Sequence, residues 1–481
     1  MVWRELTNHL DNCYFYLVNV KGFNKKNKQH LQYPDIPSAR RPVEHCEEIP
    51  VPVFTELPEI DVESLSLPAS TDDDDDAQIE YTPSDADCDN ISLFSQPELN
   101  DLVRDLYLPK QSAEFLAIRL QEKGLLRPGT SVSFYCNREA ALRKYFHSDG
   151  QLAYCNDVEG VLLDMGLPAY DSNEWRLFID SSKRSFKCVL LHNRNIYGSI
   201  PIGHSVKMNE EYANIKIVLD RLEYHFHGWL ICVDLKMVNF LLGQQGGHTK
   251  YPCFLCYWDS RATLEHWVQK NWPPRISLTP GDKNIKNEPL VDRNKIVFPP
   301  LHVKLGLMKQ FVKALDHTGD CFSYICSTFS SLNAEKKKAG IFDGPQIRTL
   351  IRDPHFVTTM TAAEARAWNA FSDVVRNFLG NRKADNYREI VEELLLSLQA
   401  LGCRMSIKVH YLHRHLAQFP ENMGHVSEEQ GERFHQDIKV MEERYQGRWD
   451  SNMMADYCWS LMRDIPQAVH RRSSKRSFMQ M

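Results

Sequence analysis

The chain has 481 residues, of which 43% are hydrophobic and 25% charged, so it can bury a large core and is long enough for two to four domains. No apolar window reaches the length of a membrane span and no secretory signal opens the chain, so we expect neither a membrane protein nor a secreted one. Thirteen cysteines, an odd number scattered through apolar segments, argue against a secreted disulfide framework and indicate a reducing compartment, the nucleus or the cytoplasm.

The charge is unevenly distributed along the chain. Residues 41–100 contain seventeen acidic residues, including the run from Asp72 to Asp76, and a single basic residue, Arg41. This segment carries a net charge of −16 and the whole chain carries −6, so the other 421 residues carry +10. A basic body beside an acidic segment is typical of a protein that binds a polyanion for which the segment competes, although a solvated linker beside an ordinary surface has the same pattern.

The first 170 residues divide into three segments. Residues 1–40 are predicted to form a small polar module, in which His9 and Cys13 lack the further ligands that a zinc site needs. Residues 41–96 are rich in Pro, Ser and Asp without periodicity, which predicts a disordered linker. Residues 97–170 have helical spacing in "PELNDLVRDLYLP", "SAEFLAIRLQEKGLL" and "NREAALRKYF", which predicts a domain of three or four helices.

Short apolar runs replace the helical spacing after Asn173. The runs "EWRLFIDSS", "FKCVLLHN" and "IYGSIPIGHSV" predict three consecutive antiparallel strands. A helix is predicted for "NEEYANIKIVLDRLEYHF", and "GWLICVDLKMVNFLLG" begins as a fourth, buried strand and continues as a helix. Residues 171–260 are therefore predicted to form the first part of an α/β core.

The second half of the chain is predicted to be helical. Residues 261–405 contain "PPLHVKLGLMKQFVKALD", "AEARAWNAFSDVVRNFLGN" and "NYREIVEELLLSLQALG", which predict an all-helical insertion. Residues 406–481 add two helices, "SIKVHYLHRHLAQFP" and "SEEQGERFHQDIKVMEERYQ", that would complete the core. The stretch "HRRSSKR" near the C-terminus weakly predicts a nuclear localisation signal.

Two aspartates end predicted strands. Asp180 closes "WRLFID" and Asp234 closes "WLICVD", each where a buried strand would reach the surface. On adjacent strands the two carboxylates would lie side by side, which is unfavourable unless a divalent cation lies between them. One such aspartate alone is more often a cap for the next turn. The pair in this strand order favours a Mg²⁺ site suited to two-metal phosphoryl transfer.

A third carboxylate would come from "SEEQGERFHQD". Glu428, Glu429 and Glu432 lie on one predicted helix, and Glu429 and Glu432 are i, i+3 neighbours that can share a face. Any exposed helix can be this acidic, so the helix alone predicts no site.

The motif "CFLC" places Cys253 and Cys256 at the spacing of half a zinc site. A redox dithiol would need the helix N-terminus of a thioredoxin-like fold, which the surrounding sequence does not offer. Two of the three histidines in "VHYLHRHL" would supply the other ligands. The candidates are His410, His413 and His415.

The three histidines lie on a predicted helix, which restricts the pairs of them that can bind one zinc ion. His410 and His413 fall on one helical face, while His415 reaches the same place only if the helix ends nearby. The zinc site would connect the segment after Asp234 to the segment before Glu429. A carboxylate that comes from so far along the chain requires such a connection.

These motifs together resemble the catalytic core of the Transib transposases and of the V(D)J recombinase derived from them. The resemblance rests on "FID", "CVD", "PCFLC", "PPLHVKLGLMKQF", "HYLHRHLAQFPE" and "SEEQGERF", and it covers residues 173–465. It implies an RNase H-like mixed sheet interrupted by a large all-helical insertion, with helical N-terminal and C-terminal segments. The chain departs from the family in the short stretch between Asp180 and Asp234 and in the lack of a familiar DNA-reading module before the core.

The resemblance also implies the roles of individual residues. The family's catalytic Asp, Asp and Glu would fall on Asp180, Asp234 and Glu429, because "EQGERF" fits its Glu-x-Gly pattern better at Glu429 than at Glu428 or Glu432. Its structural Zn²⁺ ligands would fall on Cys253, Cys256 and two of His410, His413 and His415.

The function implied is a polynucleotidyl transferase that cleaves and joins DNA with two Mg²⁺ (or Mn²⁺) ions. We expect DNA as its partner, a homodimer on DNA ends, nuclear localisation, and neither a membrane nor a small-molecule substrate. Phosphate contacts are expected from Lys183, Arg184, Lys304 and Lys309. A catalytically inactive, zinc-stabilised protein that binds DNA or protein is the alternative, and an RNase H-type nuclease without strand transfer is a third hypothesis.

Overall fold

The computed structural model describes residues 92–181, 185–446 and 450–465. The module expected at 1–40, most of the linker expected at 41–96, and the cations Lys183 and Arg184 lie outside the described residues. Within the described ranges, no helix combines the length and the hydrophobicity needed to cross a membrane.

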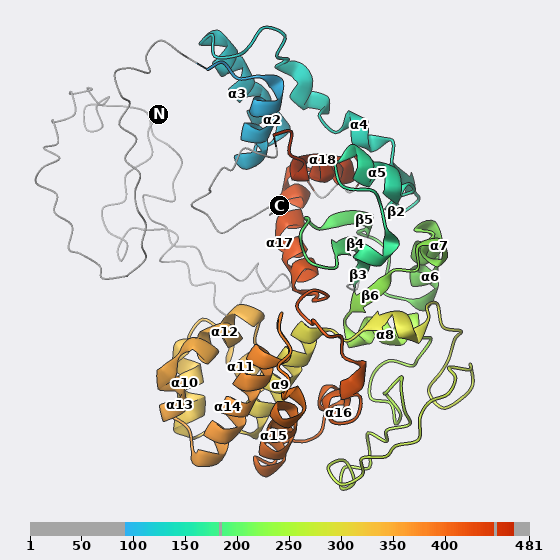
Figure 1. The fold of residues 1–481 in the computed structure, drawn as a ribbon, viewed down its shortest axis with the longest axis vertical. Coiled ribbons are helices and arrows are strands. Elements are labelled where there is room, and N and C mark those ends of the chain that lie inside the picture. The colour runs from blue at the N-terminus through green and yellow to red at the C-terminus, as the bar shows by residue number, and fades with distance from the viewer. Residues whose placement is uncertain (1–91, 182–184, 447–449, 466–481) are drawn as a thin grey trace, which may run out of the picture. The chain divides into compact units, whose positions relative to one another are not determined.

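A seven-stranded mixed sheet forms the centre of the fold (Figure 1). Its strands lie in the order β1-β2-β5-β4-β3-β6-β7. Their bounds are β1 Phe146–Asp149, β2 Leu152–Cys155, β3 Trp175–Ser181, β4 Phe186–His192, β5 Ile200–Ser205, β6 Leu230–Val233 and β7 Ile296–Val297. Neighbouring strands from β1 to β3 are antiparallel, whereas β6 is parallel to β3 and β7 is parallel to β6. The predicted mixed α/β class is confirmed.

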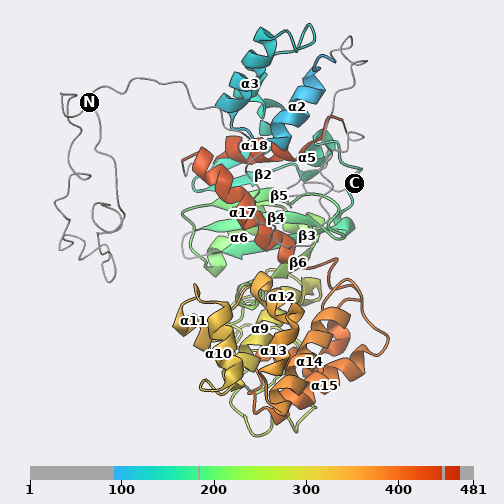
Figure 2. The same ribbon diagram turned by 90° about the vertical axis from the view of Figure 1, so that its left-hand side faces the viewer.

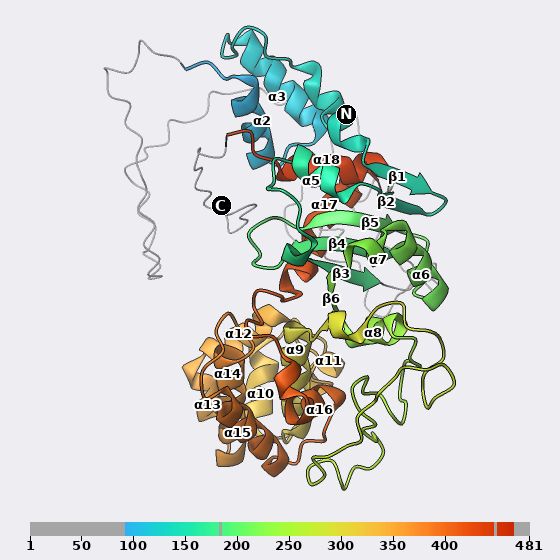
Figure 3. The same cartoon turned by 45° about the vertical axis from the view of Figure 1, so that its right-hand side comes forward.

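The elements predicted between residues 171 and 260 are present in the predicted order. Strands β3, β4 and β5 are followed by helix α6 (Tyr212–Arg221), the short α7 (Tyr224–His227), β6 and α8 (Leu235–Leu241). Strands β4 and β5 are buried along almost their whole length, so both faces of the sheet need cover. Figures 1 and 3 show α6 and α17 (Glu429–Arg444) on opposite sides of the sheet.

The segment expected to be purely helical at 97–170 is only partly so. Its helices are α2 Gln96–Asp105, α3 Lys110–Glu122, α4 Ala140–Arg143 and α5 Val158–Asp164. Strands β1 and β2 form a hairpin that extends the sheet, with Ala153 of β2 opposite His204 of β5. We did not predict this hairpin, because each strand has only four residues and its partner strand lies some fifty residues further along the chain.

The chain segment between β7 and α17 forms a helical lobe (Figure 2). Its helices are α9 Pro300–Ala314, α10 Asp320–Thr328, α11 Ala334–Lys338, α12 Gly344–Arg352, α13 Pro354–Thr358, α14 Ala362–Asn377, α15 Tyr387–Ala400 and α16 Ile407–Arg414. Helices were expected from residue 261 onward, but residues 261–295 contain no α-helix and end in a 3₁₀ turn, Arg293–Lys295. Prolines at 273, 274, 280 and 289 account for the irregular path of this segment.

The last described helix, α18 (Ser451–Leu461), connects the sheet to the N-terminal helices. The buried guanidinium of Arg138 pairs with Asp456, with Nε 2.6 Å from Oδ1. Arg138 and Arg104 also lie over the ring of Trp459, at 4.5 and 4.3 Å from its centre. Residues more than 300 positions apart are thereby held in one core.

Candidate functional site

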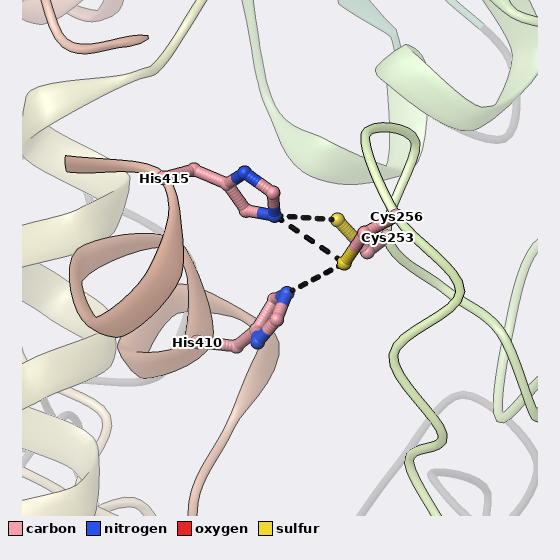
Figure 4. Close-up of side chains that lie close together, drawn as sticks. All are labelled: Cys253, Cys256, His410 and His415. Atoms are coloured by element: carbon pink, nitrogen blue, oxygen red, sulfur yellow. Dashed lines mark hydrogen bonds between the residues drawn. The ribbon is translucent and has the colours of Figure 1, made fainter. Parts of the chain in front are cut away.

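Two cysteines and two histidines from distant segments meet in one buried cluster (Figure 4). Cys253 and Cys256 lie in the irregular segment after α8, His410 lies on α16, and His415 follows the last residue of that helix. Sγ of Cys256 lies 3.3 Å from Nε2 of His410 and 3.3 Å from Nε2 of His415, and Sγ of Cys253 lies 3.5 Å from Nε2 of His415. The cysteines and His410 are at most 2% exposed.

The spacing of these atoms suits a metal ion. A tetrahedral zinc ion with sulfur at 2.3 Å and nitrogen at 2.0–2.1 Å separates sulfur from nitrogen by about 3.6 Å. All four ligand atoms of the cluster lie within 4.8 Å of one another. Among the described residues this is the only group of three or more Cys, His, Asp or Glu side chains with that property. The cluster could therefore bind a metal such as zinc.

The end of α16 decides which two histidines join the cluster. The helix ends at Arg414, and His415 leaves the helical path with φ −115° and ψ 29°. This turn brings its ring back beside His410, at 5.1 Å between ring centres. His413 is not part of the group and lies near Trp267 instead, at 6.3 Å between ring centres. Of the three histidines that the sequence left as candidates, the cluster therefore contains His410 and His415.

Electrostatics favour a thiolate at this position. A hydrogen bond with the Cys253 thiol lowers the pKa of Cys256, and contacts with His410 and His415 lower it further. Burial raises the pKa of Cys253, which a bound metal would counteract because a coordinating thiol is deprotonated. Four protein ligands leave no open position, which is typical of structural rather than catalytic zinc sites.

The cysteine segment is held in place by its surroundings. Residues 255–257 pair with 273–275 through hydrogen bonds from Tyr257 N to Pro273 O (2.8 Å) and from Arg275 N to Leu255 O (2.9 Å). The buried Arg275 donates through Nε to the carbonyl of Cys253 at 3.3 Å. The indole of Trp258 stacks on His410, at 4.6 Å between ring centres. The ligands are therefore preorganised by neighbouring residues.

Asp180 and Asp234 lie at the ends of two adjacent strands. Parallel strands β3 and β6 pair in a register that places Ile179 opposite Val233, so each aspartate follows one member of this pair. Asp234 is the N-cap of α8, and its Oδ1 accepts a hydrogen bond from the backbone N–H of Met237 at 2.6 Å. The interpretation of a strand-end aspartate as a helix cap is confirmed for Asp234, and its role in an acidic pair with Asp180 stays a prediction.

Asp180 has a histidine partner that the sequence did not suggest. Nε2 of His435, on α17, lies 3.1 Å from Oδ2 of Asp180. The other ring nitrogen of His435 lies 3.3 Å from Nζ of Lys187, which is opposite Asp180 in β4. His435 lies three residues after Glu432, and this helical spacing was the only signal in the sequence that could have identified it.

The three glutamates near the start of α17 have different environments. Glu428 is fully buried, and its Oε1 accepts the backbone N–H of His302 at 2.7 Å and lies 3.0 Å from Nδ1 of that residue. Glu429 is 45% exposed, and its carboxylate lies 2.6 Å from Nζ of Lys304 and 4.0 Å from the guanidinium of Arg348.

Of the three glutamates, Glu432 has the environment that best fits the predicted third carboxylate. Burial raises the pKa of Glu432, and the charges of Asp180 and Glu428 raise it further, although His435 and His302 oppose them. Its carboxylate lies 4.0 Å from Nε2 of His435, the same atom that contacts Asp180.

The structure does not bring Asp180, Asp234 and Glu429 together as one set of ligands. No described group of three carboxylates lies within mutual ligand distance, and Glu429 turns toward Lys304 and Arg348. The reason is helical geometry. Gly431 faces the sheet, Glu432 is about 100° away from it around α17, and Glu429 is about 160° away.

A half-buried lysine, also missed from the sequence, connects this region to the Cys/His cluster. Lys408 precedes His410 by two residues on α16. Its stem packs on α9, where a Cβ added to Gly306 would lie 2.2 Å from Cδ of Lys408. Burial lowers the pKa of Lys408 to about 8, and the charges of Asp234 and Glu428 oppose this shift.

The start of α17 is docked closely against the sheet. A Cβ added to Gly431 would lie 2.5 Å from the ring of Phe178 on β3, so only glycine allows this approach. The buried guanidinium of Arg176 on β3 donates to the carbonyl of Ser427 at 2.8 Å. The glycine of "EQGERF" thus sets the distance between the acidic helix and the strand that carries Asp180.

Gly431→Ala is therefore expected to push α17 away from β3 and to lower stability by about 1–3 kcal/mol, as overpacking of a close-packed core does. The measurement is the midpoint of urea unfolding, followed by circular dichroism. Gly246→Ala is the matched control, because a Cβ at Gly246 would meet nothing within 4 Å. Equal midpoints for the two variants would contradict the close packing of α17 on Phe178.

Two family models match parts of the chain. Residues 134–291 match a family described as "Domain of unknown function (DUF8703)", and residues 300–380 match "Domain of unknown function (DUF8704)". The comparison with curated proteins gives no match. The two matched regions are separated at 292–299, where the chain passes from the sheet into the helical lobe.

Proposed function

We propose that this chain is a DDE-type polynucleotidyl transferase of transposon origin that cleaves and joins DNA. The observation that carries the proposal is the placement of Asp180 and Asp234 at the same ends of the adjacent parallel strands β3 and β6. Strands in a sheet lie about 4.8 Å apart, a spacing at which carboxylates at the ends of neighbouring strands can share a divalent cation.

The order of elements supports an RNase H-like core for this proposal. Five neighbouring strands, β5-β4-β3-β6-β7, consist of three antiparallel strands followed by two parallel ones. Helices α6 and α8 connect β5 to β6 and β6 to β7, and α17 follows. The helical lobe enters the chain between β7 and α17, where the resembled family has its large insertion.

The metal cluster has a structural role in this proposal. A Zn²⁺ ion held by Cys253, Cys256, His410 and His415 would connect the segment after α8 to α16. Helix α17 begins fourteen residues after His415. The zinc would therefore hold the chain close to the point at which the acidic helix returns to the sheet.

The third acid in this proposal is Glu432 rather than Glu429. Glu432 interacts with Asp180 electrostatically and lies beside His435, which contacts Asp180. Asp180, Asp234 and Glu432 would hold Mg²⁺ or Mn²⁺, whose chemistry would be the activation of water and the stabilisation of charge on the scissile phosphate. The partner would be DNA, bound by a homodimer at DNA ends in the nucleus.

A comparison of two glutamate substitutions tests the choice of the third acid. Glu432→Gln should lower Mg²⁺-dependent nicking of a plasmid by on the order of 10³-fold or more, as the loss of a catalytic group does. Glu429→Gln should keep its nicking activity, because this carboxylate is paired with Lys304 outside the acidic cluster. The opposite pattern would assign the role to Glu429, as the family resemblance implies.

A second candidate function is a catalytically inactive, zinc-stabilised protein that binds DNA or protein. Two observations favour it. Asp180 is already engaged by His435, and the acidic side chains are not within mutual ligand distance. The loss or persistence of nicking in Asp180→Asn and Asp234→Asn distinguishes it from the first proposal.

A further inference from the structure

Helix α12 carries a basic groove on the surface of the helical lobe. The groove is lined by Pro345, Arg348, Thr349, Arg352 and Asp353. Ile347 and Leu350 of the same helix are fully buried, so the helix is fixed in the lobe by its apolar face. The two arginines are one turn apart on the opposite, exposed face.

The charges in this groove are mostly available to a ligand. The carboxylate of Asp353 is used locally, since it accepts the hydroxyl of Tyr324 at 2.6 Å and the backbone N–H of His355 at 2.9 Å. The side chain of Arg348 is 49% exposed, and its acidic neighbour, Glu429, is no closer than 4.0 Å. The groove therefore has an excess of positive charge that faces solvent.

The groove is continuous with the acidic region at the sheet. Glu429, the first residue of α17, lies between Lys304 of α9 and Arg348 of α12. Gly344, at the start of α12, lies against Leu301 of α9, which fixes the two helices side by side. Lys304, Arg348 and Arg352 thus follow one another away from the start of α17. Figures 1 and 2 show α12 on the side of the lobe that is nearest to the sheet.

We propose that this groove binds the phosphates of the DNA strand that continues outward from the acidic cluster, with Arg348 and Arg352 as phosphate ligands and the hydroxyl of Thr349 as a further donor. The inference rests on the proposed function. Guanidinium groups match phosphate geometry with paired N–H donors, and hydroxyls also commonly contact the nucleic-acid backbone. In the free protein Glu429 lies near Arg348 and Lys304, and a phosphate takes its place when DNA binds.

The test is the binding of a fluorescein-labelled 20-base-pair DNA duplex to the full chain, measured by anisotropy without divalent cations. The variant Arg348→Gln/Arg352→Gln should bind about tenfold more weakly than wild type, and its plot of log K against log salt should be shallower by about 1.8, for two lost phosphate contacts. Glu429→Gln should bind a few-fold more tightly, because it removes the competing carboxylate.

The matched control is Lys313→Gln/Arg404→Gln, which removes the same charge at the other end of α9. Both residues are exposed, and Cys403 lies against Gln310, which places Arg404 beside the C-terminal half of that helix. This control should reproduce wild-type affinity to within about twofold. Equal losses of DNA affinity in the two double variants, or no loss in either, would contradict phosphate binding by this groove.

Binding and cleavage are measured separately, so the inference and the proposed function can fail independently. If the chain never nicks DNA but Arg348→Gln/Arg352→Gln weakens its DNA binding, the proposed function is contradicted and the phosphate-binding groove is supported. If the chain nicks DNA and binds it equally well with and without the two arginines, the proposed function is supported and the groove is contradicted.

Discussion

Replacement of His410 and His415 together by alanine should remove bound zinc from the protein. Structural zinc contributes on the order of 10 kcal/mol of binding free energy. Cys256 and His410 are 154 residues apart, and the closure of so long a loop costs about 4–5 kcal/mol of chain entropy from its length alone. A bound zinc ion would more than offset this cost. Without it, the cysteine segment should separate from α16.

Three measurements check this expectation. Elemental analysis should find one zinc per chain in wild type and none in the double variant. Limited proteolysis should cut the segment 242–295 faster in the variant, whereas the strand signal in circular dichroism should stay near wild type. The sheet is retained because β3 to β6 lie within some sixty residues of one another and pair directly. Under the proposed function, Mg²⁺-dependent nicking should also be abolished, because the zinc would hold the part of the chain that leads into α17.

The chain offers a matched control in His413, which lies on the same helix outside the cluster. His413→Ala should retain one zinc per chain and wild-type resistance to proteolysis. A zinc-free wild-type protein, or a double variant that keeps its zinc, would show that the cluster is only a group of packed side chains.

The second large effect is expected from the two strand-end aspartates. Asp180→Asn and Asp234→Asn should each lower Mg²⁺-dependent nicking of plasmid DNA by on the order of 10³-fold or more. Asparagine has the shape of aspartate but no charge, so it binds a divalent cation poorly. At position 234 it also keeps the helix cap, because Asn is as good an N-cap as Asp and can accept the N–H of Met237. The expected loss of nicking is therefore due to the missing carboxylate charge and not to a change in the fold.

Asp220→Asn is the control for these variants, because Asp220 is an exposed carboxylate on α6 within the same domain. It should nick DNA like wild type, and all three variants should unfold at similar temperatures. If wild type shows no nicking with Mg²⁺ or Mn²⁺ above the level of Asp234→Asn, the inactive zinc-stabilised protein becomes the better description.

Much of the core was predictable because its elements are locally encoded. The strands β3, β4, β5 and β6 are short apolar runs bounded by turn residues, and α9, α14, α15, α16 and α17 have clear helical spacing. The motif at Cys253 and Cys256 was recognisable because both ligands lie within four residues. The adjacency of the strands that end at Asp180 and Asp234 followed from the strand order, and the parallel pairing of β3 with β6 confirms this adjacency.

The features that were missed depend on contacts between distant residues. The hairpin β1–β2 is stabilised by its pairing with β5, and neither four-residue strand has a strong signal of its own. The irregular segment 261–295 follows a path set by Arg275 and by pairing with the cysteine segment. Such contacts have no periodicity that a sequence pattern could show.

By itself, the sequence determined the α/β class, the order of the core strands, the aspartates at their ends and the residue types of the metal cluster, because each of these depends on neighbours within one turn or one strand. Only the tertiary structure decided that His415 rather than His413 completes the cluster, because this depends on where α16 ends. It also decided that Glu429 turns to Lys304 while Glu432 lies near Asp180. That choice depends on how α17 is rotated against β3, and the contact of Gly431 with Phe178 sets the rotation.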